Sequence, residues 1–81
     1  MRTNTQFKRL DVRPILASGG EPFSAIRQRL DTLKPGEGLI VIAPFLPSPL
    51  IEKLGSEGFT SKFERGADGE WIIYFWNEAT P

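Results

Sequence analysis

The feature that most restricts the fold is one short apolar run near the middle of this 81-residue chain. Leu39 to Ala43 is unbroken and mostly β-branched, and Gly38 and Pro44 bound it. Such a run is typical of a central strand in a sheet. A chain of this length buries only about 60–65% of its unfolded surface, which leaves room for one core. We therefore expect one domain over residues 1–81, with an ordered core of about 7–77.

The stretch before this run predicts a strand and then a loop. Residues 7–13 alternate in character and divide between two faces, with Leu10 and Val12 on one and Arg9, Asp11 and Arg13 on the other. The strand is expected to end near Arg13, because Pro14 cannot donate a hydrogen bond within a sheet. Small residues at 17–20 then favour a flexible loop.

Helical periodicity occurs twice. Apolar residues recur every three or four positions from Pro22 to Leu33, which predicts an amphipathic helix capped by Gly20 or Glu21. A turn follows at 34–37. After the apolar loop at 44–47, Ser48 is expected to cap a second helix that Pro49 starts and that Gly55 or Gly58 ends.

The last part of the chain predicts an antiparallel hairpin. Residues 59–63 alternate, 66–69 have the composition of a turn, and 71–76 are rich in aromatic and β-branched residues. The predicted fold is an α/β two-layer sandwich of order β-α-β-α-β-β, with a four-stranded mixed sheet whose first two strands are parallel. If both helices cover one face, four residues point toward them: Leu10, Val12, Ile73 and Phe75.

The order of these elements resembles the TusA/SirA-like superfamily over residues 8–77. The segments that carry the likeness are Leu10-Asp11-Val12-Arg13, Glu21-Pro22, Lys34-Pro35-Gly36-Glu37 and Glu57-Gly58-Phe59. The resemblance implies a two-layer sandwich with both helices on one face. In TusA itself a cysteine in a Cys-Pro-x-Pro motif carries persulfide sulfur, whereas the matching segment here reads Gly19-Gly20-Glu21-Pro22. The chain looks closer to a cysteine-less bacterial branch of unknown function, so sulfur transfer does not carry over.

Composition excludes several chemistries. The chain has no cysteine and no histidine, which removes disulfides, thiolate catalysis, imidazole acid–base catalysis and the usual zinc or haem ligands. Ten Lys and Arg balance ten Asp and Glu, so no net field attracts nucleic acid or anionic lipid. No calcium-loop pattern or dense acidic cluster suggests a metal. We therefore expect no cofactor and no enzymatic activity. Neither a signal peptide nor an apolar membrane span is visible in the sequence, so we expect a cytoplasmic protein.

One pair of carboxylates is a candidate for general acid–base catalysis. Asp11 and Glu21 could take the two roles if their environments differed. Asp11 lies between Arg9 and Arg13 along one strand face, which favours a permanently ionised structural carboxylate instead.

Two surfaces remain as hypotheses for binding. The first is the open sheet face, where Arg9, Ile72, Tyr74 and Trp76 would dock a protein partner or a second copy. The second is the loop before the first helix, where a small anion or ligand would meet Arg13, Ser18, Gly19, Gly20, Glu21 and Ser48, with Phe45 as an apolar wall. In the alternative readings, the aromatic residues only pack across strands and the glycines only let the loop turn. Stacking of single-stranded RNA on the same face is disfavoured by the zero net charge.

Overall fold

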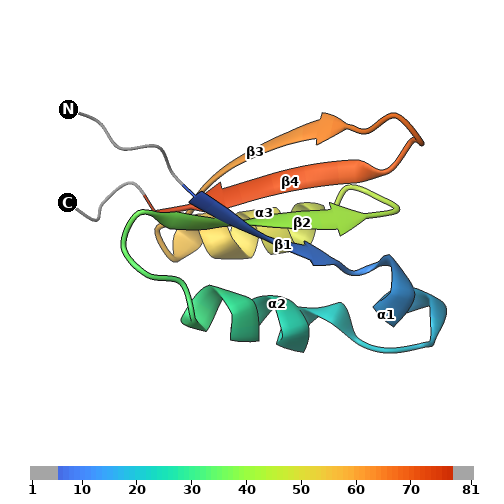
Figure 1. Ribbon diagram of the computed structural model, residues 1–81, viewed down its shortest axis with the longest axis horizontal. Coiled ribbons are helices and arrows are strands. Elements are labelled where there is room, and N and C mark those ends of the chain that lie inside the picture. The colour runs from blue at the N-terminus through green and yellow to red at the C-terminus, as the bar shows by residue number, and fades with distance from the viewer. Residues whose placement is uncertain (1–5, 78–81) are drawn as a thin grey trace.

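The computed structural model describes residues 6–77, in which helices and strands form two layers (Figure 1). In chain order the elements are β1 (Gln6–Asp11), α1 (Arg13–Ala17), α2 (Pro22–Asp31), β2 (Glu37–Ala43), α3 (Ser48–Ser56), β3 (Thr60–Arg65) and β4 (Trp71–Trp76). The predicted order β-α-β-α-β-β is confirmed, with one short helix, α1, added after the first strand.

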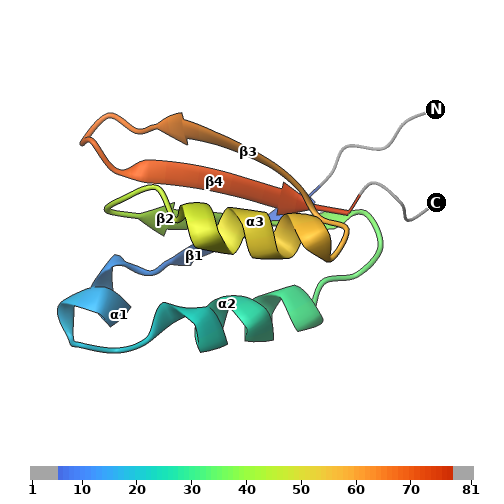
Figure 2. The same ribbon diagram turned by 180° about the vertical axis from the view of Figure 1, so that it is seen from behind.

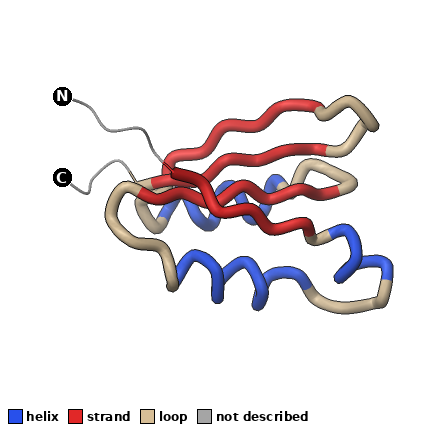
Figure 3. The backbone as a smooth tube through the Cα atoms, viewed as in Figure 1, coloured by secondary structure: helices blue, strands red, loops and turns tan. Residues whose placement is uncertain are grey.

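The four strands form one mixed sheet in the order β1-β2-β4-β3 (Figure 3). β1 and β2 are parallel, while β4 pairs antiparallel with both β2 and β3. The apolar run at 39–43 therefore lies in a central strand, as predicted. A central strand has neighbours on both sides, which explains why Leu39 and Val41 are completely buried.

Both long helices pack on the same face of the sheet. Ile26 and Leu30 of α2 and Leu50 and Leu54 of α3 belong to one buried cluster. The strand residues in that cluster are Leu10, Leu39, Val41, Ala43, Ile73 and Phe75, joined by Val12 just after β1. Figures 1 and 2 show α3 behind the sheet in one view and in front of it in the other. The predicted inward set of Leu10, Val12, Ile73 and Phe75 is confirmed, and the opposite face carries no helix among the described residues.

The end of the first strand differs from the prediction. β1 stops at Asp11 rather than near Arg13, and residues 13–17 form helix α1 instead of a loop. The Asp11 side chain accepts a hydrogen bond from the Arg13 backbone N–H at 3.0 Å, which turns the chain out of the strand. Pro14 then suits the first helical turn, where its missing N–H costs nothing. The proline that rules out a continued strand thus also starts a helix.

The boundaries of the other elements follow local capping. Glu21 caps α2, which ends at Asp31, two residues before the predicted Leu33. The prediction that Ser48 caps α3 is wrong, because Ser48 is its first residue and Pro47 occupies the cap position. Gly55 lies inside α3 rather than ending it, and Gly58, with a φ of 99°, follows the helix. The third strand runs over 60–65 instead of 59–63.

No helix between residues 6 and 77 combines the length and the apolar character that crossing a bilayer requires.

Candidate functional site

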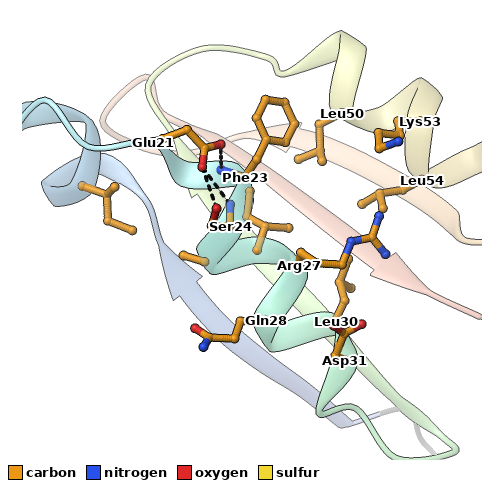
Figure 4. Close-up of a pocket in the computed structure, with 13 residues that line it drawn as sticks. Glu21, Phe23, Ser24, Arg27, Gln28, Leu30, Asp31, Leu50, Lys53 and Leu54 are labelled. Carbon is orange, nitrogen blue, oxygen red and sulfur yellow. Dashed lines mark hydrogen bonds between the residues drawn. The ribbon is translucent and has the colours of Figure 1, made fainter.

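The loop before α2 is organised around the carboxylate of Glu21. Its oxygens accept hydrogen bonds from the backbone N–H groups of Phe23 and Ser24 and, at 2.9 Å, from the Ser24 hydroxyl (Figure 4). These bonds, the Ser24 hydroxyl first, lower the pKa of Glu21. The N–H groups that an anion would use at this helix start are therefore already bound to the chain's own carboxylate.

Arg13 is held by Asp11 at the end of β1. The guanidinium donates two hydrogen bonds to the carboxylate, from Nε to Oδ1 at 2.9 Å and from Nη2 to Oδ2 at 2.7 Å. This side-chain contact is the main reason why the pKa of Asp11 is lowered. Because the pKa values of Asp11 and Glu21 are both lowered, both groups are ionised at neutral pH, and neither is poised to donate a proton.

The remaining loop residues have structural roles that their contacts explain. The Ser18 hydroxyl donates to the Ile15 carbonyl at 3.0 Å. Gly19 has a φ of 82°, which favours glycine, and a Cβ at Gly20 would lie 2.9 Å from the Ile15 side chain. Ser48 is exposed at the start of α3. The structure thus gives these glycines the role of turning the loop tightly after α1.

Replacing Glu21 by alanine should lower the melting temperature by about 5 °C, because the N–H groups at the start of α2 lose their acceptor. The pH dependence follows from the lowered pKa. Glu21 stabilises the fold at pH values above its ordinary pKa of 4.5, and that contribution disappears as the pH falls through the lower folded-state pKa. Thermal unfolding of the wild type and of Glu21→Gln between pH 7 and pH 2 checks this. A difference in melting temperature that grows toward acid pH would contradict it.

An apolar crevice lies at the same end of the molecule, between the starts of α2 and α3. It has a volume of about 70 Å³. Its lining consists of apolar residues: Val12, Leu16, Pro22, Phe23, Ile26, Val41, Ala43, Phe45, Pro47 and Leu50. The predicted apolar wall, Phe45, is part of it, but the predicted polar residues of the ligand loop are not. The sequence signal for the crevice was the apolar loop at 44–47 with a proline at each end.

A larger depression of about 800 Å³ runs along α2 (Figure 4). Its lining residues lie on both flanks of the helix, from Ile15 of α1 to Lys53 and Leu54 of α3. Arg27 of α2 crosses to Glu57, just after α3, in an ion pair of 2.8 Å. The depression is largely open to solvent, so it is a surface feature rather than an enclosed ligand site.

The open face of the sheet is built from cross-strand rows. Side chains alternate along a strand, so the residues between the buried ones point away from the helices. The register gives the rows Phe7-Gly38-Trp76-Thr60, Arg9-Ile40-Tyr74-Lys62 and Asp11-Ile42-Ile72-Glu64. The predicted residues Arg9, Ile72, Tyr74 and Trp76 lie together on this face. The polar residues of these rows all come from the edge strands β1 and β3. Apart from Phe7 of β1, the apolar and aromatic residues come from the central strands β2 and β4.

Three aromatic rings pack against one another on this face. The ring of Phe7 meets Tyr74 and Trp76 edge-on, with centroids 5.5 and 6.2 Å apart. The Tyr74 hydroxyl donates to Glu64 at 2.9 Å, which raises the pKa of Tyr74. All three rings are half-buried. Phe7 was not among the predicted site residues, although it alternates in register with Arg9 and Asp11.

Comparison with known proteins gives one family. Residues 9–77 match a family model described as "Uncharacterized conserved protein (DUF2249)". Neither the curated proteins nor the solved structures give a match. The matched range includes the crevice and nearly all of the open face, and the description assigns no activity to either.

Proposed function

Since the chain belongs to the DUF2249 family of uncharacterised conserved proteins, we propose its function from its geometry: it is a non-catalytic interaction module that pairs with a second copy through the open sheet face. We also propose that it is a cysteine-less relative of the TusA/SirA-like proteins. In this proposal the fold is kept for binding, because the atom that would carry persulfide sulfur is missing.

The observation that carries the proposal is the arrangement of charge in two neighbouring rows. Arg9 and Lys62 stand at the two ends of one row, and Asp11 and Glu64 stand at the two ends of the next. A second sheet can face the first about a two-fold axis that runs across the strands, midway between these rows. Each cation row then lies over the partner's carboxylate row, with Arg9 opposite Asp11 and Lys62 opposite Glu64.

The centre of the same rows supports a protein contact. Between the charged ends lie Ile40 with Tyr74 in one row and Ile72 in the other, where Ile42 is already buried within the chain. An apolar, aromatic centre with a charged rim is the usual anatomy of protein interfaces. The zero net charge of the chain allows two copies to approach without long-range repulsion. The composition and the charge of this face are therefore both compatible with pairing of two copies.

The proposal predicts that Lys62→Glu weakens self-association about tenfold, because a carboxylate at position 62 then faces Glu64 of the other copy in both symmetry-related pairs along the β3 edge of the contact. The double variant Lys62→Glu/Glu64→Lys exchanges the two charges and should recover much of the loss. Sedimentation equilibrium over a range of protein concentrations measures both dissociation constants, at low salt where such contacts are least screened.

Recovery of association in the double variant is the informative result. Exchanging the two charges restores association only if positions 62 and 64 face each other across the contact. A wild-type chain that remains monomeric up to millimolar concentration would overturn the proposal. So would a double variant that is weaker than the single one. If the chain instead binds a different protein on this face, the charge exchange should weaken binding further rather than restore it.

We further propose that the domain has no enzymatic activity or cofactor and works in the cytoplasm. The pKa values of Asp11 and Glu21 are lowered by local hydrogen bonds, which supports structural roles for both. Across residues 6–77, no group of three or more acidic side chains is placed to hold a metal ion. The alternative function of an anion-binding loop before α2 has less support, because Glu21 already binds the N–H groups that such an anion would use.

A further inference from the structure

The apolar crevice lies at the carboxyl ends of the parallel strands β1 and β2, where open α/β sheets commonly bind ligands. Val41 and Ala43 of β2 form its floor together with Val12, and all three are buried. Phe23 of α2 and Phe45 of the following loop stand at its mouth, with 47% and 53% of their surfaces exposed. Large hydrophobic side chains this exposed are uncommon in the part of the chain that the structure describes, where Phe63 is the other example.

The lining determines what kind of group the crevice can accept. No polar or charged side chain contributes to it, so a buried polar atom of a ligand would lose its hydrogen bonds to water without replacement. Its volume of about 70 Å³ is roughly half that of an engineered apolar cavity of about 150 Å³ that binds benzene. The crevice therefore suits an uncharged branched group of about three or four carbon atoms.

The exposed rings at the mouth of the crevice indicate that this aliphatic group is part of a larger ligand. At the affinity ceiling for very small ligands, a free molecule of four heavy atoms has a dissociation constant no lower than about 40 µM. Such a molecule would also leave the exposed rings of Phe23 and Phe45 uncovered. A polypeptide that inserts one side chain would cover these rings with its neighbouring residues. Pro22, Pro44 and Pro47 restrict the backbone beside both rings, so little conformational freedom is lost on binding.

We propose that the crevice receives the end of one aliphatic side chain, of the size of leucine, from a polypeptide partner. The site lies on the helix side of the sheet and does not depend on the open face. It would give the module a second contact surface, which a self-associated pair would still expose.

The test uses a blocked tripeptide with leucine at its centre and alanine on either side, titrated into the protein with methyl groups observed by NMR. We expect saturable shifts confined to the lining methyl groups, such as those of Val12 and Val41, with a dissociation constant in the millimolar range. The same tripeptide with glutamine at its centre should give at least tenfold weaker binding, because glutamine has similar length but a polar end. Equal binding of the two peptides would overturn the proposal.

Two variants locate the binding. Ala43→Val adds methyl groups to the floor of the crevice and should weaken the leucine peptide at least tenfold without lowering the melting temperature. Phe45→Ala removes half of the mouth and should weaken it severalfold, whereas Phe63→Ala, at a similarly exposed ring outside the lining, should not change it. Unchanged binding in both Ala43→Val and Phe45→Ala would refute the site.

A free alcohol separates the two sources of the aliphatic group. Isobutanol supplies the same branched end without a peptide. If isobutanol binds the wild type as tightly as the leucine peptide does, the rings at the mouth contribute nothing and the assignment to a polypeptide is wrong. Binding of the peptide at least tenfold more tightly than isobutanol supports it.

Discussion

Tyr74→Ala is expected to weaken self-association of the domain at least 30-fold. Tyr74 stands in the row that carries Arg9 and Lys62, next to the proposed two-fold axis, so its ring lies near the centre of the proposed contact. Truncation of a central aromatic anchor costs about 2 kcal/mol or more, which corresponds to roughly 30-fold in the dissociation constant. Sedimentation equilibrium of the wild type and the variant over the same concentrations measures the difference.

Two controls separate this effect from a loss of fold or of one hydrogen bond. Tyr74→Phe removes the hydroxyl that donates to Glu64 but keeps the ring, so it should retain most of the association. Phe63→Ala removes an exposed ring, 48% accessible, from the helix-facing side of the neighbouring strand and should leave association unchanged. The prediction fails if Phe63→Ala weakens association as much as Tyr74→Ala does. Thermal unfolding verifies that each variant is folded at the temperature of measurement.

Gly38→Ala is expected to destabilise the fold by about 1–3 kcal/mol, although it adds only one methyl group. Gly38 lies in β2 beneath the ring of Phe7. A Cβ there would lie 2.5 Å from that ring and 2.6 Å from the carbonyl oxygen of Phe75. The ring can move, but the carbonyl belongs to the neighbouring central strand and cannot move without disturbing the sheet. Urea unfolding monitored by circular dichroism measures the free energy of unfolding.

Gly55→Ala is the matched control. Gly55 lies inside α3, where a Cβ would meet nothing within 4 Å, so the same change should leave stability unchanged or raise it by up to about 1 kcal/mol. If Gly38→Ala and Gly55→Ala change the free energy of unfolding equally, the close packing at Gly38 does not contribute to stability and the prediction is wrong. The near-ultraviolet circular dichroism spectrum of Gly38→Ala should also differ from that of the wild type, because displacing Phe7 alters the surroundings of Tyr74 and Trp76.

The candidate surfaces differed in how far they could be predicted. The open face followed from alternation alone, because each strand residue takes the side opposite to its neighbour. Arg9, Tyr74 and Trp76 were therefore placed correctly before any contact was known. The loop before α2 was harder, since a helix start can bind an anion or its own capping side chain, and the two have similar sequences. Only the position of the Glu21 carboxylate distinguishes them.

Helix α1 shows a limit set by local competition. The residues of 13–17 fit a loop as well as a short helix by composition, and five residues are too few for periodicity to decide. The decision rests on the hydrogen bond from the Arg13 N–H to Asp11 and on the contact of Gly20 with Ile15.

The amino-acid sequence by itself determined the order of the main strands and helices, the side chains of the core, and the absence of thiol and imidazole chemistry. These properties depend on periodicity and composition, which are local or summed over the chain. The tertiary structure alone decided the cross-strand rows of charge, the packing of the Phe7 ring against Gly38 and the crevice behind Phe23 and Phe45. Each of these brings together residues distant in the chain, and their meeting depends on strand register and helix placement, which no local pattern encodes.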